Sequence, residues 1–293
     1  MFWMFDEQRL VKERGLERMK RVWIVLLIGV LALGLAVGCG GPEPAAEPDA
    51  VEPGEADVEE SAENGEEEAR VEDDGVLVMG TNADFPPFEF RNEQNEVDGF
   101  DVDIANAIAE AMGRDLVIED MSFDGLIPAL QAKRIDMVVA GMTITEERSE
   151  RVNFSDPYYN AGQTIVVRED NEDIQSVEDL QDKKVAVQLG TTGDFEAHDR
   201  LPDENITQFN QVNEAFLELG NNRVDAIIID IPVAERYIQL RDGFKTVGGA
   251  FTEEFFGIAV HKENPELLEE VNQVLAELKD SGVYDELISK WFE

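Results

Sequence analysis

From Gly75 to the end of the chain, short apolar segments alternate with longer segments whose apolar residues recur at helical spacing. Such alternation is typical of α/β domains in which helices cover a mainly parallel sheet. The expected strands span residues 76–80, 116–119, 135–140, 163–168, 185–189, 224–229, 244–247 and 255–260. The expected longer helices span residues 101–112, 123–133, 213–219, 265–279 and 283–292. Two successive sets of strands and helices have a similar rhythm, which predicts two α/β lobes.

One segment of this region, residues 141–148 with the sequence GMTITEER, directly follows a predicted strand. Open α/β sheets bind ligands at the carboxyl ends of their strands, so this segment lies where a site is expected. Thr145 is suited to cap a helix, and Arg148 is suited to grip a carboxylate through two parallel hydrogen bonds. Gly141 would allow a small ligand to approach the backbone closely. The alternative interpretation is an ordinary helix cap with a surface arginine.

Two further segments precede this region. Residues 22–38 form an uncharged apolar run that follows two basic residues and ends before Cys39, which is the order of an export signal. The run is short for a membrane span, although an uncleaved anchor is the alternative interpretation. Residues 1–18 are a long charged stretch that export signals lack, so we expect translation to start at Met19. These features predict a signal peptide over residues 1–39.

The sequence before Cys39, Leu-Ala-Val-Gly, resembles the lipobox of bacterial lipoproteins, with the leucine one place further from the cysteine than usual. The resemblance implies that Cys39 carries a lipid that anchors the protein to a membrane. Cys39 is the single cysteine, so the chain can form neither an intrachain disulfide nor a multi-cysteine metal site. Residues 40–74 contain 15 acidic residues and one basic residue, with few large apolar side chains. We therefore expect residues 40–74 to be a disordered, extended acidic linker.

The charge of the remaining part restricts its partners. From Gly75 onward the chain carries 46 acidic and 17 basic residues, similar to proteins from high-salt habitats. A charge near −29 argues against nucleic acid as a partner and against binding anionic lipids through the domain surface. His198 and His261 have no second ligand at metal spacing, so we predict no metal and no cofactor. No nucleophile is paired with a base in a known motif, which favours a binding protein over an enzyme.

Eight sequence blocks, taken together, resemble the extracellular solute-binding receptors (family 3) of polar amino acid ABC importers, and most of all their basic amino acid subgroup. The blocks, in the order of that family, are GTNADFPPFEF, GFDVDIANAIAEAMG, FDGLIPAL, GMTITEER, FSDPYY, VQLGTTG, IIIDIPVA and YDELISKWF. The resemblance extends over nearly all of residues 76–292. It implies an α/β periplasmic-binding-protein type II fold, with two lobes joined by a two-strand hinge. Lobe 1 would comprise residues 75–162 and 254–293, and lobe 2 would comprise residues 163–253.

The resemblance also implies how an amino acid would be held. Arg148 would grip the ligand α-carboxylate, helped by backbone groups at Gly141, Thr143 and Thr192, while Asp230 would bind the α-ammonium group. Phe85 and Phe123 would enclose the ligand side chain between two aromatic faces. The complete set of predicted ligand-binding residues is Asn82, Asp84, Phe85, Asp101, Phe123, Gly141, Met142, Thr143, Arg148, Gln188, Thr191, Thr192 and Asp230.

The function implied is that of a monomeric, non-enzymatic lipoprotein at the outer face of the cell membrane, or a periplasmic protein. It would bind a free L-amino acid and deliver it to the transmembrane subunits of an ABC permease. We expect a cationic ligand, arginine or lysine, because a guanidinium stacks favourably between two aromatic faces and Asp84 and Asp101 could supply negative charge. The alternatives are a receptor for glutamine or another polar amino acid and, with less support, a dehydratase-like enzyme on the same fold or the sensing domain of a signalling receptor.

Overall fold

A computed structural model of the chain describes residues 75–293, and every structural statement below refers to this part. The predicted signal peptide, the lipid attachment at Cys39 and the acidic linker lie outside the described residues and stay predictions. None of the helices within residues 75–293 combines the length and the apolar character that a membrane span needs.

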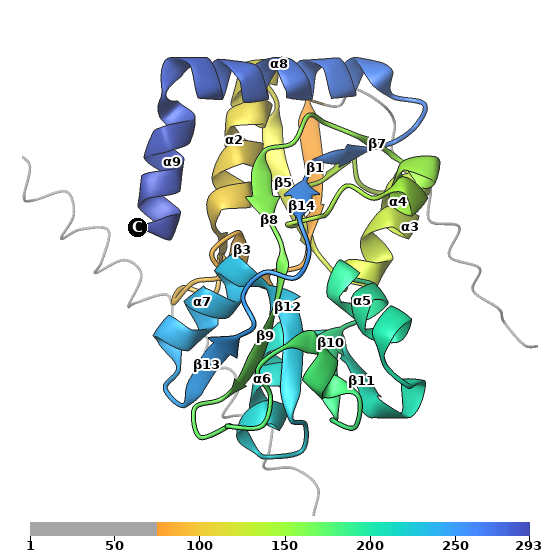
Figure 1. The fold of residues 1–293 in the computed structure, drawn as a ribbon. Coiled ribbons are helices and arrows are strands. Elements are labelled where there is room, and N and C mark those ends of the chain that lie inside the picture. Colours follow the sequence, from red (N-terminus) through yellow and green to blue (C-terminus); the bar gives the residue numbers. More distant parts are fainter. Residues whose placement is uncertain (1–74) are drawn as a thin grey trace, which may run out of the picture. The chain divides into compact units, whose positions relative to one another are not determined.

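The first sheet has the strand order β5-β1-β6-β15-β7 (Figure 1). The strands are β1 (Val76–Thr81), β5 (Asp115–Asp120), β6 (Met137–Val138), β7 (Asn153–Phe154) and β15 (Ala259–Val260). β1 runs parallel to β5 and β6, whereas β15 runs antiparallel to β6 and β7. Four of these strands precede the second sheet in the sequence, whereas β15 follows it.

The second sheet has the order β11-β10-β12-β9-β13. Its strands are β9 (Gln163–Arg168), β10 (Val185–Gln188), β11 (Ile206–Phe209), β12 (Ala226–Asp230) and β13 (Phe244–Val247). β10 is parallel to β11 and β12, and β9 is antiparallel to β12 and β13. The prediction of mainly parallel sheets is thus right for β1, β5 and β6 in the first sheet and for β10, β11 and β12 in the second. The first strand after each crossing, β9 or β15, is antiparallel to its neighbours.

Two crossings join the sheets, and they pair with each other. β8 (Tyr159–Ala161) is antiparallel to β14 (Glu254–Phe256), and Figure 1 shows both strands running between the two sheets. We call the first sheet with its flanking elements lobe 1, and the second sheet with its helices lobe 2. The α/β class and the type II architecture predicted from the sequence are confirmed.

Helices cover both sheets. Lobe 1 contains α2 (Phe100–Met112), η1 (Phe123–Gly125), α3 (Leu126–Gln131), α4 (Glu146–Arg151), α8 (Pro265–Ser281) and α9 (Val283–Phe292). Lobe 2 contains η2 (Val177–Leu180), α5 (Thr192–Arg200), η3 (Asp203–Asn205), α6 (Val212–Gly220) and α7 (Ile231–Leu240). The apolar spacing that predicted α8 corresponds to its buried face, because Leu267, Val271 and Leu275 are buried there. In Figure 1, α9 descends from the end of α8 beside α2.

Several short strands were not predicted, among them β7, β8, β11 and three strands near the pocket. β2 (Asp84–Phe85), β3 (Glu89–Arg91) and β4 (Val97–Asp98) form a small antiparallel sheet in lobe 1. Each strand has only two or three residues and two prolines separate the first two strands, so the sequence here resembles a loop. Phe85 pairs with Glu89 across this sheet, which fixes both side chains relative to the rest of the lobe.

Candidate ligand-binding site

A pocket lies between the two lobes, where β1, β10 and β12 end. Its cavity volume in this structure is about 10 Å³, roughly the room that one water molecule needs, so the two lobes lie close together around it. Its lining residues are Asn82, Phe85, Glu89, Phe123, Ala140, Gly141, Thr143, Arg148, Gln188, Thr191, Thr192 and Asp230. The fold therefore brings together all but three of the predicted site residues, from segments far apart in the sequence.

Arg148 lies at the centre of this arrangement. As predicted, Thr145 caps α4, because its hydroxyl accepts a hydrogen bond from the Arg148 N–H over 3.2 Å. The Arg148 guanidinium donates to the Thr143 carbonyl over 2.7 Å and, across the pocket, to the Gly190 carbonyl in lobe 2 over 3.0 Å. It also lies 5.3 Å from the centroid of the Phe123 ring. A guanidinium has five N–H donors, so this one can also reach an anion in the pocket.

The charge environment of Arg148 keeps it cationic. The side chain is 5% exposed, and burial lowers the pKa of Arg148 to about 10, while the negative charge of Glu254 opposes this change. Glu254 was not predicted to belong to the site. Its carboxylate accepts the hydroxyls of Thr143 and Thr192, each over 2.7 Å, and so connects the two lobes next to Arg148. Nothing in the local sequence marks this role, because Thr143 and Glu254 are 111 residues apart.

Asp230 lies on the opposite side of the pocket, at the end of β12 and directly before α7. It is 4% exposed, and its Oδ1 atom has no hydrogen-bond partner among the described residues. Burial, and then the nearby charge of Glu254, raise the pKa of Asp230 to about 8. A buried acid with a free oxygen is costly unless a ligand donor pairs with it. The pocket thus has a cation at Arg148 and a candidate anion at Asp230.

Asn82 and Gln188 connect the lobes on another side of the pocket. The Gln188 amide donates to Asn82 Oδ1 over 2.7 Å, and the Asn82 amide donates to the Met121 carbonyl over 2.8 Å. The Asn82 oxygen and nitrogen therefore both have protein partners. This pair can set the shape of the pocket, but the Asn82 side chain is not free for a ligand.

Gly141, whose backbone was predicted to help bind the ligand carboxylate, lines the pocket. Its N–H donates to Asp101 Oδ2 over 2.8 Å, so this amide is not available to a ligand. The residue has a positive φ of 49°, and a Cβ atom at this position would lie 2.8 Å from the Phe85 ring. Glycine is therefore needed here for the backbone conformation and for the close approach of Phe85.

Three predicted ligand-binding residues do not line the pocket. Asp101 is fully buried below it and accepts hydrogen bonds from Gly141 N and from the Tyr158 hydroxyl, the latter over 2.7 Å. Met142 is 1% exposed and belongs to a hydrophobic cluster of lobe 1. Asp84 turns toward lobe 2, where it accepts from Asn213 and Tyr237. In this structure Asp101, on the first turn of α2, is directed at Gly141, Met142 packs in the core of lobe 1, and Asp84 bonds to lobe 2. A part for these three residues in ligand binding stays a prediction.

Glu89 and Ala140 line the pocket without having been predicted. Glu89 is fully buried on β3, and neither of its carboxyl oxygens has a hydrogen-bond partner among the described residues. Burial, and then the charge of Asp101, raise the pKa of Glu89 well above its usual value. The residue was missed because it follows two prolines in a stretch that resembles a loop.

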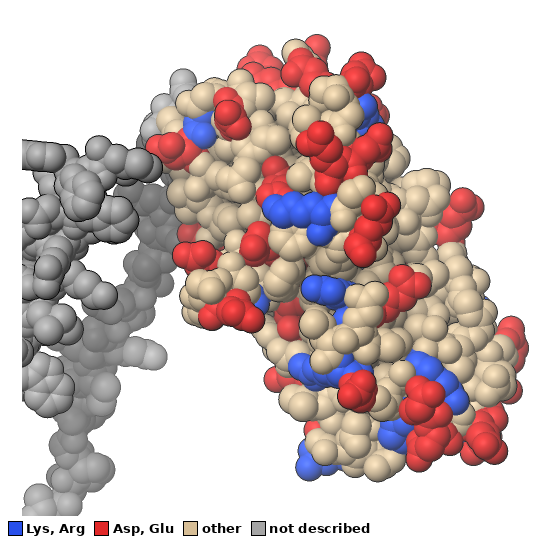
Figure 2. Space-filling view, turned by 90° about the vertical axis from the view of Figure 1, so that its left-hand side faces the viewer, with Lys and Arg blue, Asp and Glu red and all other residues tan. Residues whose placement is uncertain are grey.

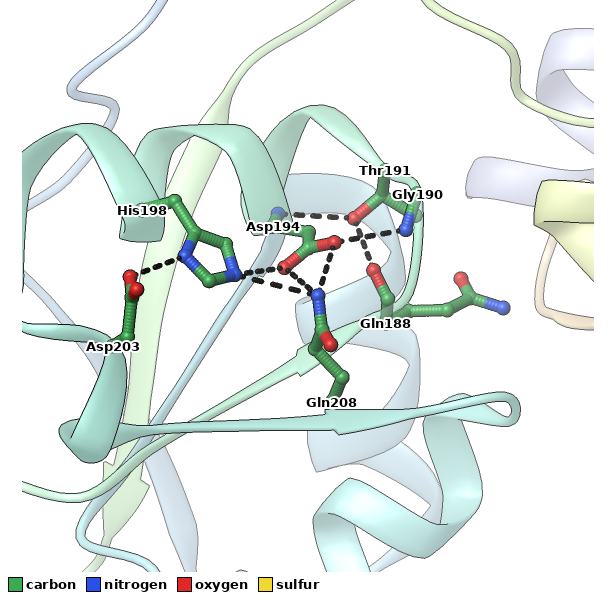
Figure 3. Close-up of polar contacts among 7 residues, drawn as sticks. All are labelled: Gln188, Gly190, Thr191, Asp194, His198, Asp203 and Gln208. Carbon is green, nitrogen blue, oxygen red and sulfur yellow. Dashed lines mark hydrogen bonds and ion pairs between the residues drawn. The ribbon is translucent and has the colours of Figure 1, made fainter.

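The lobe 2 side of the pocket is held by a network around Asp194 (Figure 3). Thr191 caps α5 by accepting the Asp194 N–H, and the Asp194 carboxylate accepts the Gly190 N–H over 3.0 Å. His198 lies between two carboxylates, 3.4 Å from Asp194 and 2.9 Å from Asp203. The network fixes Gly190, whose carbonyl accepts Arg148. Within residues 75–293 no group of acidic, histidine or cysteine side chains is arranged to hold a metal ion.

The outer surface agrees with the composition. On the face drawn in Figure 2, carboxylate side chains are scattered over the described residues and basic side chains lie singly among them. This face has no broad basic area.

The matched family is the bacterial extracellular solute-binding proteins, family 3, whose model covers residues 77–293. The chain belongs to this family, and the resemblance described from the sequence blocks is confirmed. It is similar to the arginine-binding extracellular protein ArtP of Bacillus subtilis, with 38% identity over 74% of this chain and 86% of ArtP. It is also similar to the ABC transporter glutamine-binding protein GlnH of Bacillus subtilis, with 32% identity over 94% of this chain and 98% of GlnH.

Two solved structures share the fold. The structure of holo ArgBP from T. maritima matches with a TM-score of 0.69 and 49% identity, over 75% of this chain and 96% of the ArgBP chain. The ancestral amino acid-binding protein AncCDT-1, a precursor of cyclohexadienyl dehydratase, has a TM-score of 0.70 and 44% identity, and it covers 75% and 96%. The chain is therefore an extracellular solute-binding protein with both binding proteins and an ancestor of an enzyme among its structural neighbours.

Proposed function

We propose that this protein is the substrate-binding lipoprotein of an amino acid ABC importer and that its ligand is a cationic L-amino acid, arginine or lysine. The observation that carries the proposal is that a cation, Arg148 on lobe 1, and a buried acid with a free oxygen, Asp230 on lobe 2, both line the pocket. A guanidinium with unused donors suits an α-carboxylate, and a buried acid with a free oxygen suits an α-ammonium group. The remaining predicted residues that line the pocket, apart from Asn82 and Gly141, would complete the ligand contacts.

Three observations support a cationic side chain. Phe85 and Phe123 both line the pocket, and a guanidinium between aromatic faces gains about 0.5–2 kcal/mol. The acidic surface raises the local concentration of cations. ArtP, with 38% identity to this chain, is an arginine-binding protein. ArgBP from T. maritima, with 49% identity, has also been solved in an arginine-bound form.

The ligand is best identified with a thermal-shift panel of the twenty amino acids on residues 75–293. We expect the largest rise in melting temperature with arginine or lysine, because a ligand that binds only the folded state stabilises it. If none of the twenty amino acids raises the melting temperature, the proposed function is contradicted.

The anchor and the partner form a second part of the proposal. Cys39 would carry lipid, residues 40–74 would tether the domain to the outer face of the membrane, and the loaded domain would dock as a monomer on the permease. Intact-mass analysis of membrane-extracted protein should show a lipid on Cys39 as the first residue. An unmodified Cys39, or a mature start elsewhere, would refute the anchor.

Two alternatives have specific support. Similarity to GlnH favours a glutamine receptor. Similarity to AncCDT-1 supports a dehydratase-like activity as the second alternative. Arg148 and Asp230 are both suited to hold an intact amino acid, which favours binding without catalysis. Preferential stabilisation by glutamine would favour the first alternative, and turnover of a bound substrate would favour the second.

A further inference from the structure

Glu254 lies where the two lobes and the two crossings between them meet. It is the first residue of β14, the second crossing strand, and it pairs with Ala161 on β8, the first crossing strand. Its side chain is 7% exposed, and the residues that line the pocket do not include it. The side chain of its neighbour Glu253 is exposed instead. One of the two adjacent carboxyl groups is therefore directed into the protein, between the lobes.

Three hydroxyl groups donate to the Glu254 side chain. The Thr143 and Thr192 hydroxyls donate to Oε2, each over 2.7 Å, and the Thr252 hydroxyl donates to Oε1 over 2.9 Å. A hydroxyl has one proton to donate, and an ionised carboxylate accepts only, so the three donors and their acceptor are matched. Thr143 and Thr192 both line the pocket. Glu254 thus fixes the direction of two hydroxyl groups in the pocket wall.

The bond to Thr143 lies on the lobe 1 side. Two backbone hydrogen bonds, of 2.8 and 3.0 Å, join the residues after and before Thr143 to Phe255 and Gly257. The Thr143 carbonyl in turn accepts the Arg148 guanidinium over 2.7 Å. These bonds hold Glu254, Thr143 and Arg148 together as one group that belongs to lobe 1 and the second crossing.

The other contacts of Glu254 belong to lobe 2. Thr192 is the first residue of α5, and its hydroxyl oxygen also accepts the Gln163 side-chain amide over 3.2 Å. Gln163 begins β9, and its backbone N–H donates to the Thr252 hydroxyl over 2.8 Å. Both oxygens of Glu254 are therefore connected to lobe 2, Oε2 through Thr192 and Oε1 through Thr252. Because Thr192 moves with lobe 2, its bond to Glu254 forms only when the lobes are together.

We propose that Glu254 is a positioning residue of the binding site, which fastens the start of α5 at Thr192 to lobe 1 when the lobes close on a ligand. The proposal deepens the proposed function and rests on it. By holding Thr143 and Thr192, Glu254 sets the distance between the two sides of the pocket, across which Arg148 reaches the Gly190 carbonyl. Its partners are protein groups, so it strengthens the binding of every amino acid ligand by the same factor.

The test is titration calorimetry of the protein with arginine, lysine and glutamine, on wild type and on Glu254→Gln. Glutamine keeps the size of the side chain but removes its charge and one of its two acceptors. We expect the Kd of each ligand that wild type binds to rise by about 10- to 150-fold, the effect of a lost hydrogen bond to a charged group. Glu253→Gln removes the same charge from the exposed neighbour and should bind as wild type.

Thr192 gives a second test that leaves the buried carboxylate in place. Thr192→Val removes the hydroxyl and should weaken binding by a factor similar to that of Glu254→Gln, whereas Thr192→Ser restores the hydroxyl and should recover most of the affinity. The double variant Glu254→Gln/Thr192→Val should lose no more than either single variant, because both substitutions remove the same bond. A carboxylate that only stabilised the fold would lower the melting temperature and leave the affinity of the folded protein unchanged.

Three results would overturn the inference and leave the proposed function intact. They are equal affinities of wild type and folded Glu254→Gln, a loss confined to arginine and lysine, and a double variant whose loss is the product of the two single losses. If Glu254→Gln does not fold, Thr192 decides, and equal affinities of Thr192→Val and Thr192→Ser overturn the inference. Failure of wild type to bind any amino acid overturns the proposed function and the inference with it.

Discussion

Asp84 and Tyr237 belong to different lobes, and the Tyr237 hydroxyl donates a hydrogen bond to the Asp84 carboxylate over 3.0 Å. The same carboxylate accepts the backbone N–H of Asn213 at the start of α6 over 2.8 Å. Tyr237 is held for this contact by Phe216, whose ring stacks on it with 4.3 Å between the centroids. Asp84 thus fastens the β2–β3 segment of lobe 1 to two helices of lobe 2 outside the pocket.

Replacing Asp84 with alanine should weaken the binding of every ligand by a similar factor. The bonds from Tyr237 and Asn213 form only when the lobes are together, and buried hydrogen bonds to a charged group contribute about 1.5–3 kcal/mol, or roughly 10- to 150-fold in affinity. We expect the loss in the dissociation rate, measured by stopped-flow fluorescence. Tyr237→Phe should give a smaller loss, and the exposed Glu96→Ala should give none. A change in the arginine-to-glutamine preference would instead place Asp84 in ligand recognition.

Replacing Arg148 with alanine should nearly abolish binding while the domain stays folded. Removal of one partner of a buried charge pair costs about 2–5 kcal/mol, roughly 30- to 4000-fold in affinity. The matched control is Arg151→Ala on the same helix, because Arg151 is exposed and bonds only to the Gln131 side chain. Calorimetry that finds less than a threefold change in Arg148→Ala would remove this residue from the site.

The ligand-free domain should lose stability as the pH rises from about 4 to 8. The pKa of Asp101 is raised from 3.8 to about 6, and that of Asp230 to about 8, so the folded state holds these protons more tightly than the unfolded chain. This stabilisation is complete below pH 3.8 and is lost as the pH rises through the folded values. For Asp101 alone the loss is on the order of 2–3 kcal/mol.

Denaturant unfolding at several pH values measures this dependence. Asp101→Asn should flatten the curve between pH 4 and 6, whereas the exposed Asp115→Asn should leave it unchanged. Repulsion among the many surface carboxylates acts in the same direction, so the comparison between variants decides. An unchanged slope in Asp101→Asn would show that this carboxyl group does not hold its proton in the folded state.

Replacing Gly141 with alanine should impair both folding and binding. The φ of 49° is strained for alanine, and the added Cβ would come 2.8 Å from the Phe85 ring, which forms one wall of the pocket. We expect a loss of about 1–2 kcal/mol in the free energy of unfolding. Gly113→Ala tests the backbone effect alone, because Gly113 also has a positive φ, of 65°, but has no atom near its Cβ position. Equal effects of the two substitutions on ligand affinity would contradict the role given to Phe85.

Local signals in the sequence were sufficient for the start of α4. The cap at Thr145 was predicted correctly because a helix cap and the residues of its first turn are specified by neighbours in the chain, while ligand binding by Arg148 stays a prediction. Asp84 and Asp101 could not be placed in the same way, because their directions depend on the pairing of β2 with β3 and on the packing of α2. Glu89 and Glu254 were missed because their partners lie in other parts of the chain, which only the folded structure brings together.

Competition calorimetry of arginine, lysine and glutamine on the wild-type domain, at moderate salt and pH 7, is the most direct test of the central claim. The proposed recognition by Arg148, Asp230 and the two phenylalanines predicts that arginine or lysine displaces glutamine and binds about tenfold or more tightly, which corresponds to about 1.4 kcal/mol. Binding of glutamine at least as tightly as arginine and lysine would contradict the cationic specificity.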